Sequence, residues 1–459
     1  MYPTIEERLT TPILSTYDVI VCGGGTAGVV AALASARNGA NTLLVENYGF
    51  LGGSMINGAG PLHSFFNCYK AFDVEKIKTV RGIADEIIER MISKDGCLGH
   101  LEQERGANYD SVATIIDWEK FKDIIFTMMT EAGVNLLLHT QIVGAMMKEK
   151  TIDGIIVENK SGRGAYRAKC VIDCTGDADV CHYAGANAPL KALDKNAHIS
   201  VGMPFGMSGV DMAKACAYLE EKGLVYNLIH ADKGDENDDV VRIGFELKKL
   251  APFGDYMNPR RMWGPLCVSR TVNELNFINM ANVDIDNPLD AEQLTKAEIE
   301  LRHQVMEIAQ MMIDHLPGFE NACVNWTPIQ AGVRRTRIVD CEYDITMEDI
   351  VSARKFEDDV AVYGFHDLAP RQYIKDGGYF GIPYRALLPK GVEGLLVAGR
   401  SITTDWVAHM STRNTVSCMA QGQAVGTAAA LCAKQNVTPR ALPYGQLREQ
   451  LLQDNVFLG

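Results

Sequence analysis

The stretch YDVIVCGGGTAGVVAALASARNGANTLLVE, residues 17–46, constrains the fold of this chain more than any other segment. It begins with a short apolar run rich in β-branched residues, 18–22, which is typical of a buried parallel strand. Three glycines follow, and then an alanine-rich run, 27–37, that favours a helix. A second apolar run, 41–46, ends in an acid. This order predicts the strand–helix–strand unit of a dinucleotide-binding sheet.

The glycines of this stretch have the spacing Gly23-x-Gly25-x-x-Gly28. The first permits a tight turn, the second lets a pyrophosphate approach the backbone, and the third lets the helix pack close to the strand. Free N–H groups at the helix start would face the phosphates. Glu46, eighteen residues after Gly28, can accept hydrogen bonds from ribose hydroxyls. A purely structural turn is the alternative, but the complete strand–helix–strand–acid order predicts a bound dinucleotide.

A second glycine pair, Gly52-Gly53, lies in the loop NYGFLGGSMINGAG soon after Glu46. A nicotinamide-binding fold does not require this pair. FAD is longer and lies extended, so the backbone of this loop could reach its pyrophosphate or its ring. The alternative is a loop that needs glycine for a positive φ angle. The pair therefore favours FAD.

A later apolar run, 168–174, ends in Thr175, Gly176 and Asp177. A strand that stops there would place backbone N–H groups and a carboxylate at the carboxyl edge of the sheet, where ligands bind in such folds. A simple turn explains the three residues equally well.

Near the C-terminus another apolar run, 394–398, ends in Gly399 and Arg400. From about Asn414 the sequence becomes a small-residue helix that contains Gly422. The start of such a helix carries a partial positive charge and could stabilise an anionic reduced flavin ring. The alternative is a helix whose glycines serve only close packing.

Composition excludes several classes of protein. The net charge of −14 argues against a nucleic acid or an anionic membrane as partner. No apolar run approaches the ~20 residues of a membrane helix, and the polar N-terminus does not resemble a signal peptide. The twelve cysteines contain no C-x-x-C pair, so we expect reduced thiols, no metal site and a cytoplasmic protein.

The middle of the chain shows no second Gly-x-Gly-x-x-Gly turn after a strand. We therefore expect no resident nicotinamide domain, so that the substrate itself or a separate electron donor reduces the flavin. The absence of a closely spaced cysteine pair also argues against a disulfide-reductase mechanism.

Taken in order, these motifs closely resemble those of the FAD-dependent oxidoreductase family that shares the glutathione-reductase-type two-dinucleotide flavoprotein fold. The similarity covers nearly the full length, through the segments GGGTAGVVAA, LLVE, FLGG, VIDCTGDADV, GIPYRALLPKGVEGLLVAGR and STRNTVSCMAQGQAVGTAAAL. It implies an α/β fold: a Rossmann-like FAD-binding domain with a parallel sheet and helices, plus a mixed α+β substrate domain. The expected FAD-binding domain comprises 1–60, 111–188 and 379–459, and the expected substrate or cap domain comprises 61–110 and 189–378.

The resemblance also implies which residues contact FAD. Many relatives with this fold carry Gly-Asp where this chain has Gly399-Arg400, so Arg400 departs from the wider pattern. The residues expected at the cofactor are Gly23, Gly25, Thr26, Ala27, Gly28, Glu46, Asn47, Gly52, Gly53, Ser54, Ile142, Val143, Thr175, Gly176, Asp177, Gly399, Arg400 and Gly422.

Flavin chemistry needs a positioned substrate and a group that handles the companion proton. His63 lies just past the flavin loop, and His409 lies close to the C-terminal helix; these are the predicted proton-transfer residues. Tyr384, Arg385 and Arg413 are predicted to orient a substrate carboxylate or carbonyl. For each histidine the alternative is a hydrogen-bonded core residue.

The leading hypothesis is an FAD-dependent oxidoreductase that moves a hydride between a small organic substrate and flavin N5. The substrate carries a hydroxyl, an amine or an activated C=C bond. The alternatives are a single-domain NAD-type dehydrogenase and a protein whose flavin is not catalytic. A homo-oligomer is left open.

Overall fold

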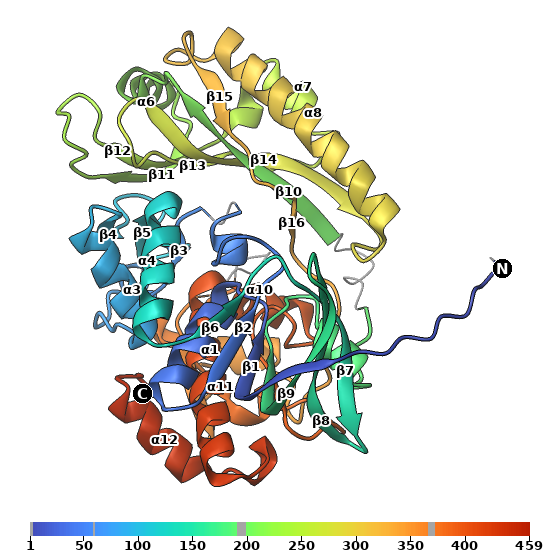
Figure 1. Cartoon of the computed structure of the whole chain (residues 1–459). Helices are drawn as coiled ribbons and strands as arrows, with labels where there is room; N and C mark the ends of the chain where they lie inside the picture. The colour runs from blue at the N-terminus through green and yellow to red at the C-terminus, as the bar shows by residue number, and fades with distance from the viewer. Residues whose placement is uncertain (1–2, 58–59, 191–198, 366–371) are drawn as a thin grey trace.

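A computed structural model describes residues 3–57, 60–190, 199–365 and 372–459. Figure 1 shows two bodies, each built on a seven-stranded sheet, with a smaller layer between them. The lower body contains the N-terminal glycine motif and the C-terminal helices, and the upper body contains the middle of the chain. The contact between the bodies is where the candidate site lies.

The sheet of the lower body is mixed. Its order is β6-β2-β1-β9-β8-β7, and β19 pairs with β9. Strands β6, β2, β1, β9 and β19 run parallel, whereas β8 and β7 add an antiparallel hairpin. The bounds are β1 (Ile13–Cys22), β2 (Thr42–Val45), β6 (Asn135–Leu137), β7 (Gln141–Lys148), β8 (Thr151–Asn159), β9 (Gly162–Asp173) and β19 (Leu395–Val397).

Two helices cover this sheet and contact each other closely: α1 (Thr26–Arg37) and α11 (Thr415–Gln435). A Cβ added at Gly422 would lie 2.2 Å from the carbonyl oxygen of Ala27, and one added at Gly426 would lie 2.2 Å from that of Ala31. The two helix backbones therefore touch, which requires glycine at these two positions.

The sheet of the upper body is antiparallel, in the order β11-β12-β13-β14-β10-β15 with β16 beside β10. Its strands are β10 (Ile199–Ser208), β11 (Val225–His230), β12 (Val240–Phe245), β13 (Leu266–Val268), β14 (Glu274–Ile285), β15 (Cys323–Trp326) and β16 (Gly332–Val333). The long helix α8 (Ala291–His315) packs along β14 and β10 on the side away from the lower body (Figure 1). Helices α6 (Met212–Glu221) and α7 (Phe253–Met257) complete this layer.

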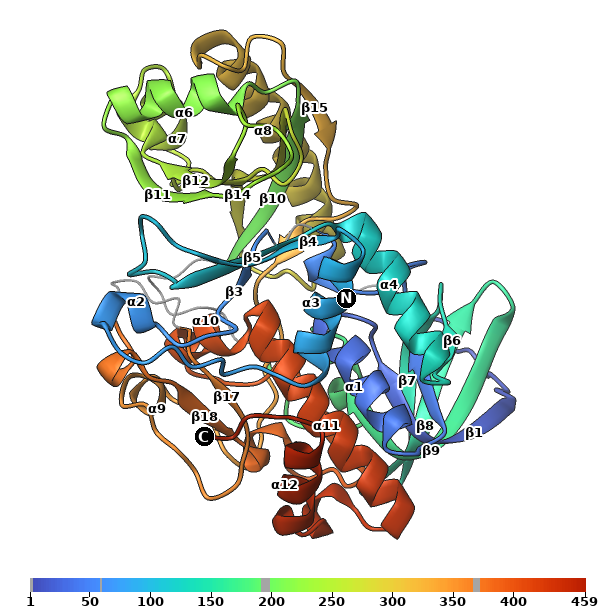
Figure 2. The ribbon, with the colours of Figure 1, turned by 90° about the vertical axis from the view of Figure 1, so that its left-hand side faces the viewer.

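A small sheet in the order β3-β5-β4 lies between the two bodies (Figure 2). Its strands are β3 (Leu62–His63), β4 (Cys97–Glu102) and β5 (Val112–Ile116). Ala113 and Ile115 of β5 pack against apolar residues of the upper sheet, including Ile229 and Val268. Helices α3 (Ile83–Ser93) and α4 (Trp118–Glu131) flank it on the side of α1.

The remaining elements are short and mostly surround α11. The pair β17 (Asp359–Tyr363) and β18 (Phe380–Pro383) packs on that helix. The others are α2 (Tyr69–Phe72), α5 (Asp179–Tyr183), α9 (Met347–Val351), α10 (Trp406–Thr412), α12 (Tyr444–Gln453) and the 3-10 turns η1 (Gly53–Met55), η2 (Leu247–Lys249), η3 (Lys375–Gly377), η4 (Tyr384–Leu387) and η5 (Pro439–Ala441).

The predicted α/β class is confirmed, with a second α+β body. The first sheet is mixed rather than wholly parallel because the chain turns back on itself between β7 and β9. Three strand pairs cross the predicted domain boundaries: β5 pairs with β3 and with β4, and β18 pairs with β17. The division into domains stays a prediction.

Candidate functional site

The turn between β1 and α1 has the shape that the glycine spacing predicts. Gly23 has φ +96°, and a Cβ there would lie 2.5 Å from the carbonyl oxygen of Cys174. A Cβ on Gly28 would lie 1.8 Å from the carbonyl oxygen of Gly23, so the helix sits directly on the turn. A Cβ on Gly25, in contrast, would meet no atom within 4 Å. The chain therefore leaves open space at the residue just before α1.

That open space adjoins an uncapped helix start. Gly25 is the N-cap of α1 and provides no side-chain hydrogen bond, and the buried residues Thr26 and Ala27 form the first turn. The first N–H groups of a helix have no partner within it and attract anions. Uncapped N–H groups beside open space are the features that bind a pyrophosphate at the start of a helix.

The Glu46 carboxylate bonds to the backbone of two segments, the Gly23–Gly28 turn and the start of the loop that leads to Gly52 and Gly53. Its Oε2 accepts a hydrogen bond from the Gly24 N–H at 2.6 Å, and its Oε1 accepts one from the Tyr48 N–H at 2.8 Å. Burial raises the pKa of Glu46, while these N–H groups and that of Asn47 oppose the rise. Each carboxylate oxygen keeps a second lone pair, so both can still accept from a ribose hydroxyl. The side chain of Asn47 is exposed.

The Gly52-Gly53 loop folds onto the first glycine turn. Gly52 has φ +112° and donates its N–H to the carbonyl oxygen of Gly24 at 2.8 Å. A Cβ on Gly53 would lie 2.9 Å from the Cα of Gly25. The loop therefore needs glycine for its positive φ, and it lies against the Gly23–Gly28 turn, which we call the phosphate turn after its predicted ligand. The contact of this loop with FAD stays a prediction. Ser54 follows with an exposed side chain.

The start of β7 lies beside Glu46. The N–H of Thr140 donates to the carbonyl oxygen of Glu46 at 3.0 Å, and Ile142 and Val143 follow within β7 as partly buried residues. Ile142 and Val143 thus lie in the strand that begins next to Glu46, and their contact with the cofactor stays a prediction. Gly422, predicted with them, contacts the backbone of Ala27 in the first turn of α1.

The segment after β9 is held by Arg400. Its Nε donates to the carbonyl oxygen of Gly176 at 2.7 Å, and its Nη2 lies 2.6 Å from Asp177 Oδ1. Its Nη1 donates to the carbonyl oxygen of Val333. The guanidinium thus ties the end of β9 to the upper body. Gly399 donates its N–H to Gln421 of α11, and Thr175 bonds to Asp173.

His409 does not have the surroundings of a proton-transfer group. It is 1% exposed, and its Nε2 lies 3.2 Å from the carbonyl oxygen of Arg334. Burial lowers its pKa well below the ordinary value, and the nearby Arg413 and Arg335 lower it further. A neutral imidazole that donates to a carbonyl oxygen is a structural group. The contacts of His409 therefore favour the alternative that the sequence left open.

His63 lies in a different environment. Its Nδ1 is 2.9 Å from Asp110 Oδ2, and Asp110 is 1% exposed. The His63 ring stacks on Phe365 at 5.2 Å between centroids and meets the ring of Tyr109 edge-on at 5.5 Å. The Oδ1 of Asp110 accepts from Ser64 Oγ at 2.7 Å. A carboxylate on Nδ1 fixes the tautomer and leaves Nε2 to give or take a proton.

Tyr363 connects this pair to the C-terminal helix. Its hydroxyl donates to the carbonyl oxygen of His63 at 3.0 Å. The thiol of Cys418, in the first turn of α11, is close enough to act on the pKa of Tyr363, as is Asp110. The Cys418 thiol in turn bonds to the carbonyl oxygen of Arg413, and α11 has no side-chain cap at its start. The structure thus brings His63 and Arg413 to the same end of α11.

Tyr384 and Arg385 lie at the other end of that helix. The Tyr384 hydroxyl donates to the carbonyl oxygen of Pro439 at 3.1 Å. Burial raises the pKa of Tyr384, and Cys432 is close enough to raise it further. Cys432 is seventeen residues past Thr415, about 25 Å along the helix. Arg385 pairs with Asp358 at the surface. The structure thus brings neither residue to the end of α11 where His63 lies.

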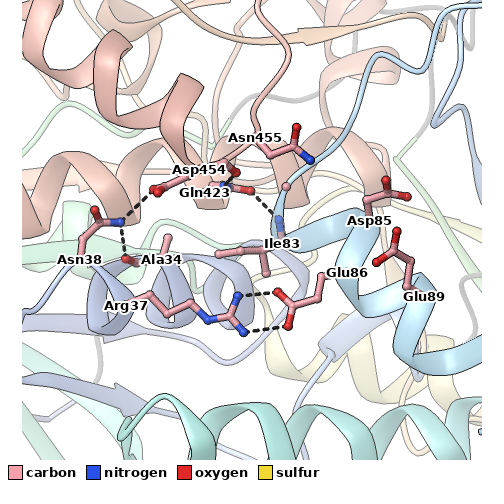
Figure 3. A pocket seen from close by; sticks show the side chains of 11 residues that line it. Ala34, Arg37, Asn38, Ile83, Asp85, Glu86, Glu89, Gln423, Asp454 and Asn455 are labelled. Carbon is pink, nitrogen blue, oxygen red and sulfur yellow. Dashed lines mark hydrogen bonds and ion pairs between the residues drawn. The ribbon is translucent and has the colours of Figure 1, made fainter. Parts of the chain in front are cut away.

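A cavity of about 280 Å³ lies away from this chemistry (Figure 3). It is at the C-terminal end of α1, where Arg37 pairs with Glu86 and Asn38 bonds to Asp454. Its lining comprises Ala34, Arg37, Asn38, Gly82, Ile83, Asp85, Glu86, Glu89, Gln423, Asp454 and Asn455. Because the glycine turn is at the opposite end of α1, this cavity is not part of the dinucleotide site.

All twelve cysteines are free thiols, and all except Cys323 are buried. Within the four described ranges, no helix is both long and apolar enough to span a bilayer. The same residues contain no group of three histidine, cysteine or acidic side chains placed to hold a metal.

Sequence reasoning missed Asp110, Tyr363 and Arg242. Asp110 is 47 residues from His63 and Tyr363 is 300, so no spacing rule connects them. Arg242 is a single basic residue in an otherwise apolar strand, and that buried charge was the available signal.

Comparison with known proteins agrees with the geometry. A family model described as FAD dependent oxidoreductase matches residues 18–451. A digeranylgeranylglycerophospholipid reductase of Methanococcoides burtonii is 25% identical over 44% of this chain and 47% of its own length. The corresponding enzyme of Methanocella arvoryzae is 28% identical over 39% of this chain and 44% of its length. The chain thus spans less than half the length of these curated relatives.

Among solved structures, the myxobacterial chondrochloren halogenase CndH matches with a TM-score of 0.51 and 10% identity. The match covers 95% of this chain and 78% of the halogenase, and at this identity it shows the fold alone. The residues of the glycine turns fit the FAD that the family model requires. The chain therefore belongs to the FAD dependent oxidoreductase family.

Proposed function

We propose that this chain reduces a C=C bond of a small organic substrate, with His63 as the group that delivers the proton. The single observation that carries this proposal is the His63–Asp110 pair at the start of α11. The direction of the reaction is supported by the curated relatives, which are named as reductases of a digeranylgeranyl lipid. When bound, FAD supplies the two-electron redox chemistry.

Each residue of the pair has a distinct task. Asp110 holds Nδ1 of His63 and stabilises the ring when it carries a second proton. Phe365 and Tyr109 fix the plane of the ring. Saturation of a C=C bond adds a hydride equivalent to one carbon and a proton to the other. His63 Nε2–H donates that proton and becomes neutral.

The start of α11 adds an electrostatic contribution. Its first N–H groups have no side-chain cap, and the helix is 21 residues long. Its partial positive charge stabilises negative charge that develops nearby. The pair and the helix start therefore provide proton donation and charge stabilisation in one place.

We also propose that the fold is of the glutathione-reductase type. This is supported by the parallel strands β1, β2, β6, β9 and β19 and by the antiparallel hairpin that extends β9. The expected small-molecule substrate and any separate electron donor belong to this proposal.

The proposal is tested by reducing the FAD-loaded enzyme anaerobically and mixing it with a panel of alkenes activated by a carbonyl group. Reoxidation is followed by flavin absorbance. We expect His63→Ala to retain FAD and to slow reoxidation about 100-fold, the usual range for a lost general acid. Asp110→Asn should slow it as well, because the ring loses its anionic partner.

His100→Gln is the matched control. His100 is also a partly buried histidine on the small sheet, where its Nδ1 bonds to Thr114 Oγ1. Its substitution tests general damage to this layer and should leave the rate close to that of the parent enzyme. An unchanged rate in His63→Ala would refute the role of His63. If alcohols or amines bleach the oxidised flavin and no alkene reoxidises the reduced one, the proposed direction is wrong.

A further inference from the structure

Arg242 is a buried cation that the flavin site does not use. It lies in the middle of β12 and is 0% exposed. None of its three guanidinium nitrogens has a hydrogen-bond acceptor among the described residues. Burial lowers the pKa of Arg242, and the charge of Asp110 opposes that change. An ion buried without a partner costs several kcal/mol, so the fold needs a reason to keep it.

The negative charge of Asp110 raises the pKa of Arg242, but the two side chains do not form an ion pair. Among the described residues, Asp110 has an ion pair with His63 and none with Arg242 within an N···O distance of 4.0 Å. The two oxygens of Asp110 are already used by His63 and Ser64. The guanidinium therefore faces a place where an acceptor is missing.

Two more buried side chains on this side of the upper sheet have polar atoms without a hydrogen-bond partner among the described residues. The side chain of Gln103 is 0% exposed, and neither its oxygen nor its nitrogen has a partner among the described residues. Asn227 is 3% exposed, and its Oδ1 is also without a partner there. The N–H of Glu104 donates to the carbonyl oxygen of Leu228 at 3.1 Å, so Gln103 lies against β11.

This group is close to the proton-transfer pair. Ile229 and Val268 flank Arg242 across the upper sheet and pack on β5. Arg242 is therefore at the contact between the upper sheet and the small sheet that carries His63. Figure 2 shows the small sheet lying next to the upper sheet. The Tyr109 ring packs edge-on against the His63 ring, and Tyr109 is also close enough to Arg242 to raise its pKa.

We propose that Arg242 binds a carboxylate of the substrate, so that the substrate is an unsaturated carboxylic acid. This rests on the proposed reduction of a C=C bond near His63. The planar guanidinium matches a carboxylate with two parallel hydrogen bonds. Asp110 is paired with His63, and the Arg242 guanidinium has no acceptor among the described residues, so a substrate carboxylate would supply the negative partner that Arg242 lacks.

Binding is measured with the oxidised, FAD-loaded enzyme in a low-salt buffer without other carboxylates. The probes are crotonate, trans-cinnamate and longer trans-2-enoates, each compared with its primary amide, and inorganic phosphate. We expect at least one acid to raise the melting temperature of the parent enzyme while its amide does not. Calorimetry of that acid with Arg242→Met should show affinity reduced about 10- to 100-fold, the effect of a lost charged hydrogen bond.

The same variants without any probe give a second readout. Because Arg242→Met removes an uncompensated buried charge, it should melt at or above the temperature of the parent enzyme. Arg242→Lys keeps the charge but loses the planar fork, and it should bind the acid about tenfold more weakly. Arg270→Met is the control: Arg270 follows β13 and is paired with Asp117, so the acid should bind unchanged.

The inference is overturned if no acid in the panel binds better than its amide. It is also overturned if Arg242→Met melts well below the parent enzyme while Arg242→Lys binds acid normally, because Arg242 is then a structural cation hydrated by buried water. An Arg242-dependent shift with phosphate alone refutes the carboxylate class. These measurements need no turnover, so acid binding that survives a failure of the His63→Ala test would separate this inference from the proposed reaction.

Discussion

At the scale of single residues, two histidines predicted for the same task differ through their neighbours. His63 faces a carboxylate and its side chain is 14% exposed. His409 faces Arg413 and Arg335 and is 1% exposed. Burial and these two positive neighbours lower the pKa of His409 well below its ordinary value, whereas the Asp110 carboxylate binds one ring nitrogen of His63. The residue type alone therefore could not assign the proton-transfer role.

Asp359 of β17 provides a prediction at this scale. Burial raises its pKa to about 6, against an ordinary value of 3.8. The folded state binds this proton more tightly than the unfolded chain, so the stability it contributes is full below about pH 4 and is lost as the pH rises to about 6. Asp359→Asn should therefore be more stable than the parent by about 2–3 kcal/mol above pH 7 and no more stable near pH 4. Urea unfolding at several pH values measures this.

Asp349→Asn is the control of opposite sign. Burial acts to raise the pKa of Asp349, but hydrogen bonds from Thr346, Arg354 and Tyr343 outweigh it and hold the pKa below 3.8. The stability that Asp349 contributes is present above pH 4 and is lost as the pH falls. This variant should be less stable than the parent at pH 7, and the difference should shrink in acid. Parallel pH profiles for the two variants would contradict both assignments.

At the scale of elements, the contact of α1 with α11 positions both ends of the cofactor site. The first turn of α1 faces the phosphate turn, and the start of α11 lies near His63. Gly422 and Gly426 allow the two backbones to touch. A change in the distance between these helices would therefore move the two parts of the site relative to each other.

Gly426→Val tests this contact. The new Cβ would begin 2.2 Å from the carbonyl oxygen of Ala31, and backbone atoms cannot turn away as a side chain does. We expect the variant to lose at least the ~1–3 kcal/mol typical of an overpacked core. Thermal unfolding of the FAD-saturated protein measures the loss.

The neighbouring Thr427→Val is the matched control. Thr427 is 0% exposed, and its hydroxyl has no partner in the described part of the chain. The substitution keeps the shape and removes an unsatisfied polar group, so stability should stay equal or rise. Equal melting temperatures for Gly426→Val and the parent would show that the helices can separate without cost.

At the scale of the whole molecule, FAD should hold together segments that are far apart in the sequence. The phosphate turn, the segment after β9 and the start of α11 come from three separate parts of the chain. A ligand that binds only the folded state stabilises it by mass action, by about 2.7 kcal/mol at 100 times its dissociation constant. Removal of FAD should therefore lower the melting temperature, and added FAD should restore it.

Gly25→Val should abolish this recovery without unfolding the protein. A Cβ at Gly25 meets no protein atom within 4 Å, so the valine would occupy the space of the pyrophosphate instead of clashing with the chain. Gly445→Val is the control, because Gly445 of α12 also has open space around it and lies away from the site. If Gly25→Val is still stabilised by FAD and keeps its flavin absorbance, the phosphates bind elsewhere.

The sequence by itself determined the first strand–helix–strand unit, the two glycine loops and the position of Glu46. These features depend on neighbours within about thirty residues, and glycine spacing and apolar runs report such local geometry directly. It also determined the family, because the order of the motifs survives over nearly the whole chain.

Only the tertiary structure decided which polar residues meet. It paired His63 with Asp110, placed Tyr384 beside Cys432 in the last turns of α11, used Arg400 to link the two bodies, and left Arg242 buried without an acceptor among the described residues. These contacts join strands from different sheets and helices distant in sequence. Their energies depend on burial and on the charges of groups that no local pattern encodes.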